Sequence, residues 1–72
     1  MKNNYFGKTL KELRLEKGLS QQKLGEIFHV CNQTVSFWEL GSREPDLDTL
    51  LLIARFFDVT TDYLLNGDTL SL

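Results

Sequence analysis

Residues that start and stop helices recur at short intervals along this chain, and they leave room only for short helices. Gly18, Gly41 and Gly67 are each placed to end a helix in a left-handed residue, and Ser20 and Asp46 are typical N-cap residues. Between these positions apolar residues recur every three or four residues, and no useful length of sequence alternates with a period of two. We therefore predict an all-α fold of five short helices.

The apolar spacing also predicts where the helices lie. We expect them over about residues 5–17, 20–28, 31–40, 46–57 and 60–65. In the fourth helix, the stripe that should face the core consists of Leu47, Leu50, Leu51, Ala54 and Phe57.

Leu52 and Phe56 form a second apolar stripe on the fourth helix. They lie about 140° to 180° around the helix from Leu47, so we expect that they cannot face the same core. One interpretation is partial burial against the C-terminal tail, residues 67–72, which contains Leu70 and Leu72. The other is a seam between two copies of the chain.

Length and composition exclude several classes of function. The 72 residues predict one domain, 1–72, with a modest core and no room for a deep catalytic pocket. No apolar run approaches the roughly 18 residues of a membrane span, and the N-terminus lacks a signal peptide's apolar core, so we expect a cytoplasmic protein. One cysteine and one histidine are too few for a zinc site, and neither a nucleophile–base arrangement nor a phosphate loop is present. We expect no metal, no cofactor and no enzymatic activity.

Charge is divided unevenly along the chain. The net charge is −2 and the pI is about 5.2, which by themselves argue against a nucleic-acid partner. Seven lysines and arginines and four acidic residues precede residue 44, whereas one arginine and six acidic residues follow residue 43. The basic part could face a polyanion, and scattered solvated charges are the alternative.

The stretch HVCNQTVSFWELG, residues 29–41, predicts a helix with two different faces. At about 100° per residue, Val35 and Trp38 point to one side. The opposite arc holds Asn32, Gln33, Ser36, Phe37 and Leu40. A helix that reads the DNA major groove needs such an arc, with amides for adenine N6 and N7 and an apolar group for the thymine methyl. A surface helix with a polar first turn would show the same pattern.

A very tight turn separates this helix from the one before it. Gly25 lies in the first helix where the second should cross it, although glycine costs about 1 kcal/mol of helix propensity relative to alanine. Close approach of the two helices explains that residue, and a glycine without a special role is the alternative. Two helices joined in this way form a helix-turn-helix, here at about residues 20–40.

Residues 10–65 resemble the Cro/cI, or XRE-type, helix-turn-helix family of phage and bacterial repressors. The motifs that carry the resemblance are LxxLRxxxGLSQ from Leu10, the stretch from Val30 to Trp38 and Glu39 with Gly41, Pro45, LxxIA from Leu50, and VTTDYLL from Val59. Each motif is weak alone, and together they are specific. The resemblance implies a compact five-helix bundle of the lambda-repressor-like DNA-binding type with a central helix-turn-helix. It also implies binding to double-stranded operator DNA, usually as a homodimer on a palindromic site.

The resemblance implies roles for individual positions. Gln21 would contact a phosphate or a base edge, and Thr34 would lie next to the DNA backbone. The family's base-reading positions are occupied here by Asn32, Gln33, Ser36 and Phe37. The loop that contacts the backbone after the recognition helix falls on Ser42 and Arg43. A buried ion pair between the first and third helices would join Arg14 and Glu39.

Some positions depart from the family pattern. His29 stands where the turn usually has glycine, and histidine tolerates a positive φ better than most residues, so we assign it a structural role. Cys31 stands where serine usually caps the recognition helix; a thiol is a weaker cap, which makes Asn32 an alternative cap and puts its base contact in question. Phe37 is apolar where polar residues are common, which favours a thymine-methyl contact or a wedge.

Two functions are compatible with this fold. The first is a sequence-specific DNA-binding transcriptional regulator, a repressor. The alternative is a protein-binding module, such as an antitoxin that neutralises a partner toxin with its acidic second half and autoregulates its operon. Salt-sensitive DNA binding by the purified chain would favour the first function.

Overall fold

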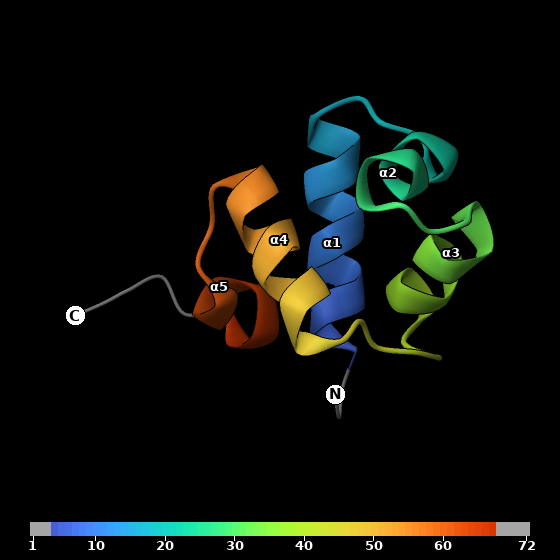
Figure 1. Ribbon diagram of the computed structural model, residues 1–72. Helices are drawn as coiled ribbons and strands as arrows, with labels where there is room; N and C mark the ends of the chain where they lie inside the picture. The colour runs from blue at the N-terminus through green and yellow to red at the C-terminus, as the bar shows by residue number, and fades with distance from the viewer. Residues whose placement is uncertain (1–3, 68–72) are drawn as a thin grey trace.

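The computed structural model describes residues 4–67, and all regular structure among them is helical (Figure 1). The helices are α1 Tyr5–Glu16, α2 Gln21–Phe28, α3 Asn32–Leu40, α4 Leu47–Phe57 and α5 Thr61–Asn66. The predicted five-helix, all-α fold is confirmed, and each end lies within one residue of the predicted one. From residue 68 onward, the expected C-terminal tail lies outside the described residues.

Side-chain caps fix where three of the helices begin. Ser20 Oγ accepts a hydrogen bond of 2.9 Å from the N–H of Lys23 at the start of α2. Asp46 and Thr60 cap α4 and α5 in the same way, each through the N–H three residues further on. These bonds satisfy N–H groups that have no partner within the helix. The capping residues predicted from the sequence therefore set the lengths of these elements.

One core connects all five helices. Its buried apolar residues are Phe6, Leu10, Leu24, Val35, Trp38, Leu50, Ile53, Ala54, Phe57 and Leu64. Helix α1 lies between the α2–α3 pair and the α4–α5 pair, and it contacts both α3 and α5 (Figure 1). None of the helices in residues 4–67 has the length and apolar character to cross a membrane.

The buried stripe of α4 differs from the predicted one. Leu47 and Leu51 are 68% and 44% exposed, whereas Ile53, which was not predicted to be buried, is fully buried. The reason is the uninterrupted apolar run from residue 50 to residue 54, which covers more than one face of a helix and allows two phases of the same periodicity. Packing against the other helices selects the phase that buries Leu50, Ile53, Ala54 and Phe57.

The expectation that Phe56 cannot face the core is also wrong. Its ring packs edge to face against Phe28, with 5.6 Å between the ring centroids, and against Phe57 at 4.9 Å. The end of α2 therefore covers a second side of α4, which single-helix periodicity cannot predict. Leu52 remains 53% exposed. Leu70 and Leu72, the partners in one of the two interpretations, lie outside the described residues.

Candidate nucleic-acid interface

Helix α3 is fixed by one face and exposes the other. Val35 is fully buried and Trp38 is 4% exposed, so both belong to the core. Asn32 and Gln33 are exposed at the first turn, and Phe37 is 37% exposed one turn further on. Ser36 and Thr34 are half-buried. The two faces predicted from the helical periodicity are confirmed, with amides at the N-terminal end of the exposed face.

The turn between α2 and α3 depends on two special residues. His29 adopts the left-handed conformation, with φ 62° and ψ 40°, as the sequence predicted. The N–H of Val30 donates to the carbonyl of Gly25 at 2.8 Å, which closes the end of α2. A Cβ added at Gly25 would lie 2.5 Å from the carbonyl oxygen of Val30. Gly25 therefore permits a close approach, but to the backbone of the turn at Val30 and Cys31 and not to α3 itself.

The N-terminus of α3 begins at Cys31, whose side chain makes no capping hydrogen bond. Its Sγ lies 3.3 Å from Thr34 Oγ1, and this hydrogen bond lowers the pKa of the Cys31 thiol. Asn32 is the first residue of the helix, so the interpretation of Asn32 as an alternative cap is wrong. The cap must have the extended backbone that Cys31 provides, and the Asn32 side chain stays exposed.

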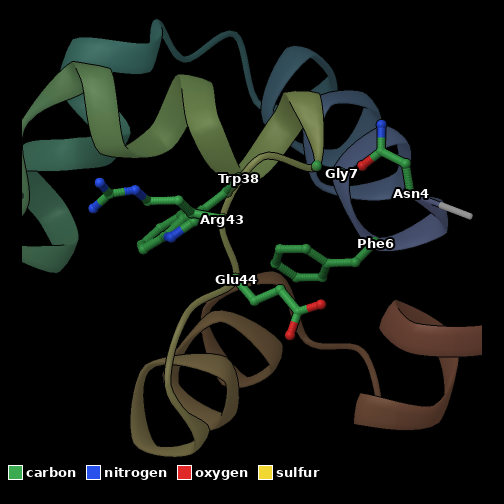
Figure 2. Close-up of a pocket in the computed structure, with 7 residues that line it drawn as sticks. Asn4, Phe6, Gly7, Trp38, Arg43 and Glu44 are labelled. Atoms are coloured by element: carbon green, nitrogen blue, oxygen red, sulfur yellow. The ribbon is translucent and has the colours of Figure 1, made fainter. Parts of the chain in front are cut away.

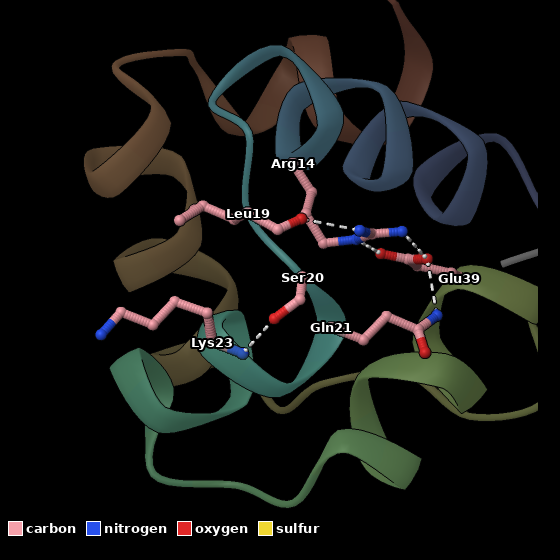
Figure 3. A network of polar contacts seen from close by, with 6 residues as sticks. All are labelled: Arg14, Leu19, Ser20, Gln21, Lys23 and Glu39. Carbon is pink, nitrogen blue, oxygen red and sulfur yellow. Dashed lines mark hydrogen bonds and ion pairs between the residues drawn. The ribbon is translucent and has the colours of Figure 1, made fainter.

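A buried ion pair connects α1 to α3 (Figure 3). Arg14 Nε lies 2.7 Å from Glu39 Oε2, and Arg14 Nη2 donates to Oε1 at 3.1 Å. Arg14 Nη1 also donates to the carbonyl of Leu19 at 2.8 Å. The two side chains are 9% and 4% exposed. The pair expected from the family resemblance is therefore present, with two parallel hydrogen bonds.

Gln21 is connected to the same carboxylate, which the sequence did not predict. Its Nε2 donates to Glu39 Oε1 at 3.0 Å. A carboxylate only accepts hydrogen bonds, so the NH₂ group of the Gln21 amide must face Glu39. Figure 3 shows the amide oxygen of Gln21 directed away from Glu39. The half-buried Gln21 thus has one amide orientation before any partner binds.

Asn4 also holds the C-terminal end of α3, through the backbone of Glu39, and sequence reasoning missed this contact as well. Asn4 Nδ2 donates to the backbone carbonyl of Glu39 at 3.3 Å. Its side chain lies against Gly7 and Gly41, beside a small hollow that Trp38 also lines (Figure 2). A Cβ at Gly41 would lie 2.6 Å from Asn4 Oδ1. One signal in the sequence could have indicated this close contact, namely Gly7 inside α1, because a glycine lowers helix propensity.

The loop after α3 places a cation beside the exposed face. The N–H groups of Ser42 and Arg43 both donate to the carbonyl of Phe37, at 2.9 Å and 3.3 Å. The guanidinium carbon of Arg43 lies 5.4 Å from the centroid of the Phe37 ring. Two residues that the sequence assigned separately, one to a base and one to the backbone, are therefore in contact.

The aspartates of the acidic second part of the chain also lie on one side of the molecule. Four exposed aspartates belong to α4, α5 and their flanking residues, on the opposite side of α1 from α2 and α3 (Figure 1). They are Asp46, Asp48, Asp58 and Asp62. Within residues 4–67, no group of three or more His, Cys, Asp or Glu residues could hold a metal ion.

A helix-turn-helix whose second helix presents amides, with a cation in the next loop, defines a domain of the class that inserts a helix into the DNA major groove. The chain belongs to the helix-turn-helix family, which it matches over residues 10–64. The resemblance to Cro/cI-type regulators is thereby confirmed.

Bacterial transcriptional regulators match most of this chain in sequence. It is 42% identical over 66 residues to ImmR, an HTH-type transcriptional regulator of Bacillus subtilis, a match that covers 92% of this chain and 52% of ImmR. It is also 40% identical over 65 residues to BcrR, an HTH-type transcriptional activator of Enterococcus faecalis. That match covers 90% of this chain and 32% of BcrR. The chain thus spans about half of one relative and about a third of the other.

A solved structure shares the fold. The c2 repressor of Salmonella phage P22, crystallised in complex with a synthetic operator, superposes with a TM-score of 0.81. The two chains are 32% identical, and the match covers 88% of this chain and 96% of that one.

Proposed function

We propose that this chain is a sequence-specific double-stranded DNA-binding transcriptional regulator, a repressor, that reads an operator through the major groove with α3. The observation that carries the proposal is the exposed face of α3, where Asn32 and Gln33 lie free while Val35 and Trp38 fix the opposite face. The operator complex of the P22 c2 repressor supports it, because that domain has the same fold. Operator binding requires access to bacterial DNA, so the proposal places the protein in the cytoplasm.

Each exposed group of the interface receives a role in this proposal. Gln33 pairs with adenine N6 and N7, because its amide donates and accepts in one plane. Phe37 contacts a neighbouring thymine methyl. Asn32 and Ser36 are the other base-reading candidates, and Thr34 and Arg43 contact the DNA backbone. Gln21 contacts a phosphate or a base edge.

Gln33→Ala tests direct readout. The substitution should weaken binding to an operator selected from a random duplex library by about 1–3 kcal/mol, because one bidentate base contact is lost. Affinity for an unrelated duplex and its salt dependence should stay nearly unchanged, since no phosphate contact is removed. Asn66→Ala, which removes an exposed amide from the end of α5, is the matched control and should bind as the parent does. If Gln33→Ala still discriminates the operator from a copy altered at one A·T pair as well as the parent does, Gln33 is not the reader.

Salt dependence tests the electrostatic part of the proposal. Affinity should fall steeply with salt, with a slope set by roughly 4–6 phosphates for each half-site. Substitution of Arg43 by alanine should reduce that slope by about 1. Binding that does not change with salt concentration would contradict the proposal.

The antitoxin alternative has one observation in its favour. Leu47, Leu51 and Leu52 are all substantially exposed on α4 beside Asp48, which is a surface that a protein partner could cover. A purified chain that binds no duplex at low salt, and that forms a stable complex with the product of an adjacent reading frame, would favour this function. The two functions can also coexist in one protein.

A further inference from the structure

We propose that Phe37 is a positioning residue for the DNA contact of Arg43, in addition to any contact that Phe37 itself makes with a base. This inference rests on the proposed function, because it concerns the same interface. It assigns to one aromatic side chain a contribution to affinity that does not depend on the base sequence.

The contact between the two residues is fixed by the backbone. Helix α3 ends with the N–H groups of Ser42 and Arg43 both bonded to the carbonyl of Phe37, at 2.9 Å and 3.3 Å. Gly41, with φ 83°, makes the reversal of the chain that these bonds require. The Arg43 side chain therefore starts close to the Phe37 ring, and its guanidinium carbon lies 5.4 Å from the ring centroid.

The guanidinium group keeps its hydrogen-bond donors. In the part of the chain from residue 4 to residue 67, none of the ion pairs or side-chain hydrogen bonds involves Arg43. A cation–π contact does not use the N–H donors of arginine, of which there are five. The ring therefore holds the group in place without occupying the donors that a phosphate oxygen would accept from.

Holding the side chain in advance should increase affinity for DNA. A free arginine loses much of its rotamer entropy when it binds, and a pre-positioned one loses less. The contact is at an exposed site, where a cation–π interaction corresponds to about a two- to fivefold change in an equilibrium constant. Phe37 is 37% exposed, so part of its ring also remains accessible to a base.

The two roles of Phe37 predict different losses. A residue that only contacts a thymine methyl affects binding to the operator and leaves unrelated duplexes unaffected. A residue that positions a phosphate-binding arginine affects every duplex, because all duplexes present phosphates.

The experiment is a double-mutant cycle measured on two duplexes. Phe37→Leu keeps an apolar side chain and removes the aromatic ring, whereas Phe37→Trp keeps an aromatic ring. Each is combined with Arg43→Ala, and dissociation constants are measured on the operator and on an unrelated duplex. Thermal melting of every variant ensures that affinities are compared at a temperature where all are folded.

We expect Phe37→Leu to weaken binding to the unrelated duplex about two- to fivefold, and Phe37→Trp, which keeps an aromatic ring, to weaken it less than Phe37→Leu does. In the Arg43→Ala background, Phe37→Leu should have no effect on that duplex. A loss confined to the operator, or an equal loss with and without Arg43, would overturn this inference alone and leave the proposed function intact. A parent protein that binds neither duplex would overturn both.

Discussion

At the scale of single residues, Glu39 is the point that connects three helices. Its carboxylate accepts hydrogen bonds from Arg14 of α1 and Gln21 of α2, while its own backbone belongs to α3. A charge with so little access to water is tolerated only when donors surround it. The orientation of α3 relative to α1 therefore depends on this one side chain as well as on the apolar core.

We expect Glu39→Ala to lower the free energy of unfolding by about 3 kcal/mol, because it leaves the Arg14 charge buried without its partner. Urea unfolding followed by circular dichroism measures the change. The double variant with Met at position 14 and Leu at position 39 should lose much less, since it buries no unpaired charge. Should Glu39→Ala unfold at the parent's urea concentration, the ion pair contributes nothing to stability.

The residues around Glu39 show which contacts a sequence can predict. Arg14 and Glu39 occupy motif positions, so a family resemblance was enough to pair them. The bond from Gln21 was not predicted, because it depends on how α2 crosses the end of α3. The contact between Asn4 and the end of α3 was not predicted for the same reason, since Asn4 and Glu39 are 35 positions apart in the chain.

At the scale of elements, the junction of α2 and α3 has no space for a larger residue. We expect Gly25→Ala to destabilise the protein by about 1–3 kcal/mol, because its Cβ would meet a backbone oxygen and the turn would have to move. The same substitution at an open helix position would stabilise the helix by about 1 kcal/mol. Gln22→Ala, at an exposed position of α2, is the control and should be neutral or stabilising. Equal melting temperatures for Gly25→Ala and the parent would show that the turn can adapt.

The cap of α4 should make stability depend on pH in the acidic range. Hydrogen bonding to Thr49, first by its side chain and then by its backbone N–H, lowers the pKa of Asp46 below its ordinary value. A lowered folded pKa means that the carboxylate stabilises the fold above the ordinary pKa, and that this stabilisation is lost as pH falls through the lower, folded value. As pH is lowered, the melting temperature of Asp46→Asn should thus fall less than that of the parent protein, because asparagine can cap the helix and has no carboxyl group to protonate. Identical pH profiles for the two proteins would show that Asp46 does not contribute.

Helix ends were predicted well because capping is local, and helix faces were predicted less well because packing is not. Ser20, Asp46 and Thr60 act through a backbone N–H three residues ahead, which the sequence itself specifies. Leu51 and Ile53 lie in one apolar run, and only the neighbouring helices determine which of them is buried. The two faces of α3 were predicted correctly because Val35 and Trp38 share one side of the helix while both amides of its first turn lie on the other.

At the scale of the whole molecule, α1 separates two surfaces of different character. Helices α2 and α3 lie on one side of α1, and α4 and α5 lie on the other (Figure 1). The exposed amides belong to α3 and Arg43 to the loop after it, whereas the exposed aspartates belong to α4, α5 and their flanking residues. The sequence predicted the separation from the order of charges along the chain. It could not predict that Phe37 and Arg43 meet, because their contact depends on how the chain reverses after α3.

The exposed leucines of α4 lead to the prediction for the assembled protein. One interpretation of the stripe of Leu52 and Phe56 is a seam between two copies, and a two-fold dimer would place two recognition helices about 34 Å apart, one DNA turn. Phe56 packs on Phe28, so its substitution would also disturb the fold. Leu52 is 53% exposed and can be changed without opening the core.

Leu52→Lys should therefore shift the protein from dimer to monomer in light scattering and weaken operator binding, while its melting temperature at low protein concentration stays close to the parent's. Leu15→Lys introduces the same charge at a leucine on α1 that is 57% exposed, and it should leave both assembly and operator binding unchanged. The comparison separates the loss of a dimer contact from the effect of an added lysine, since only the position differs. A parent protein that remains monomeric both free and on operator DNA would rule out the dimer.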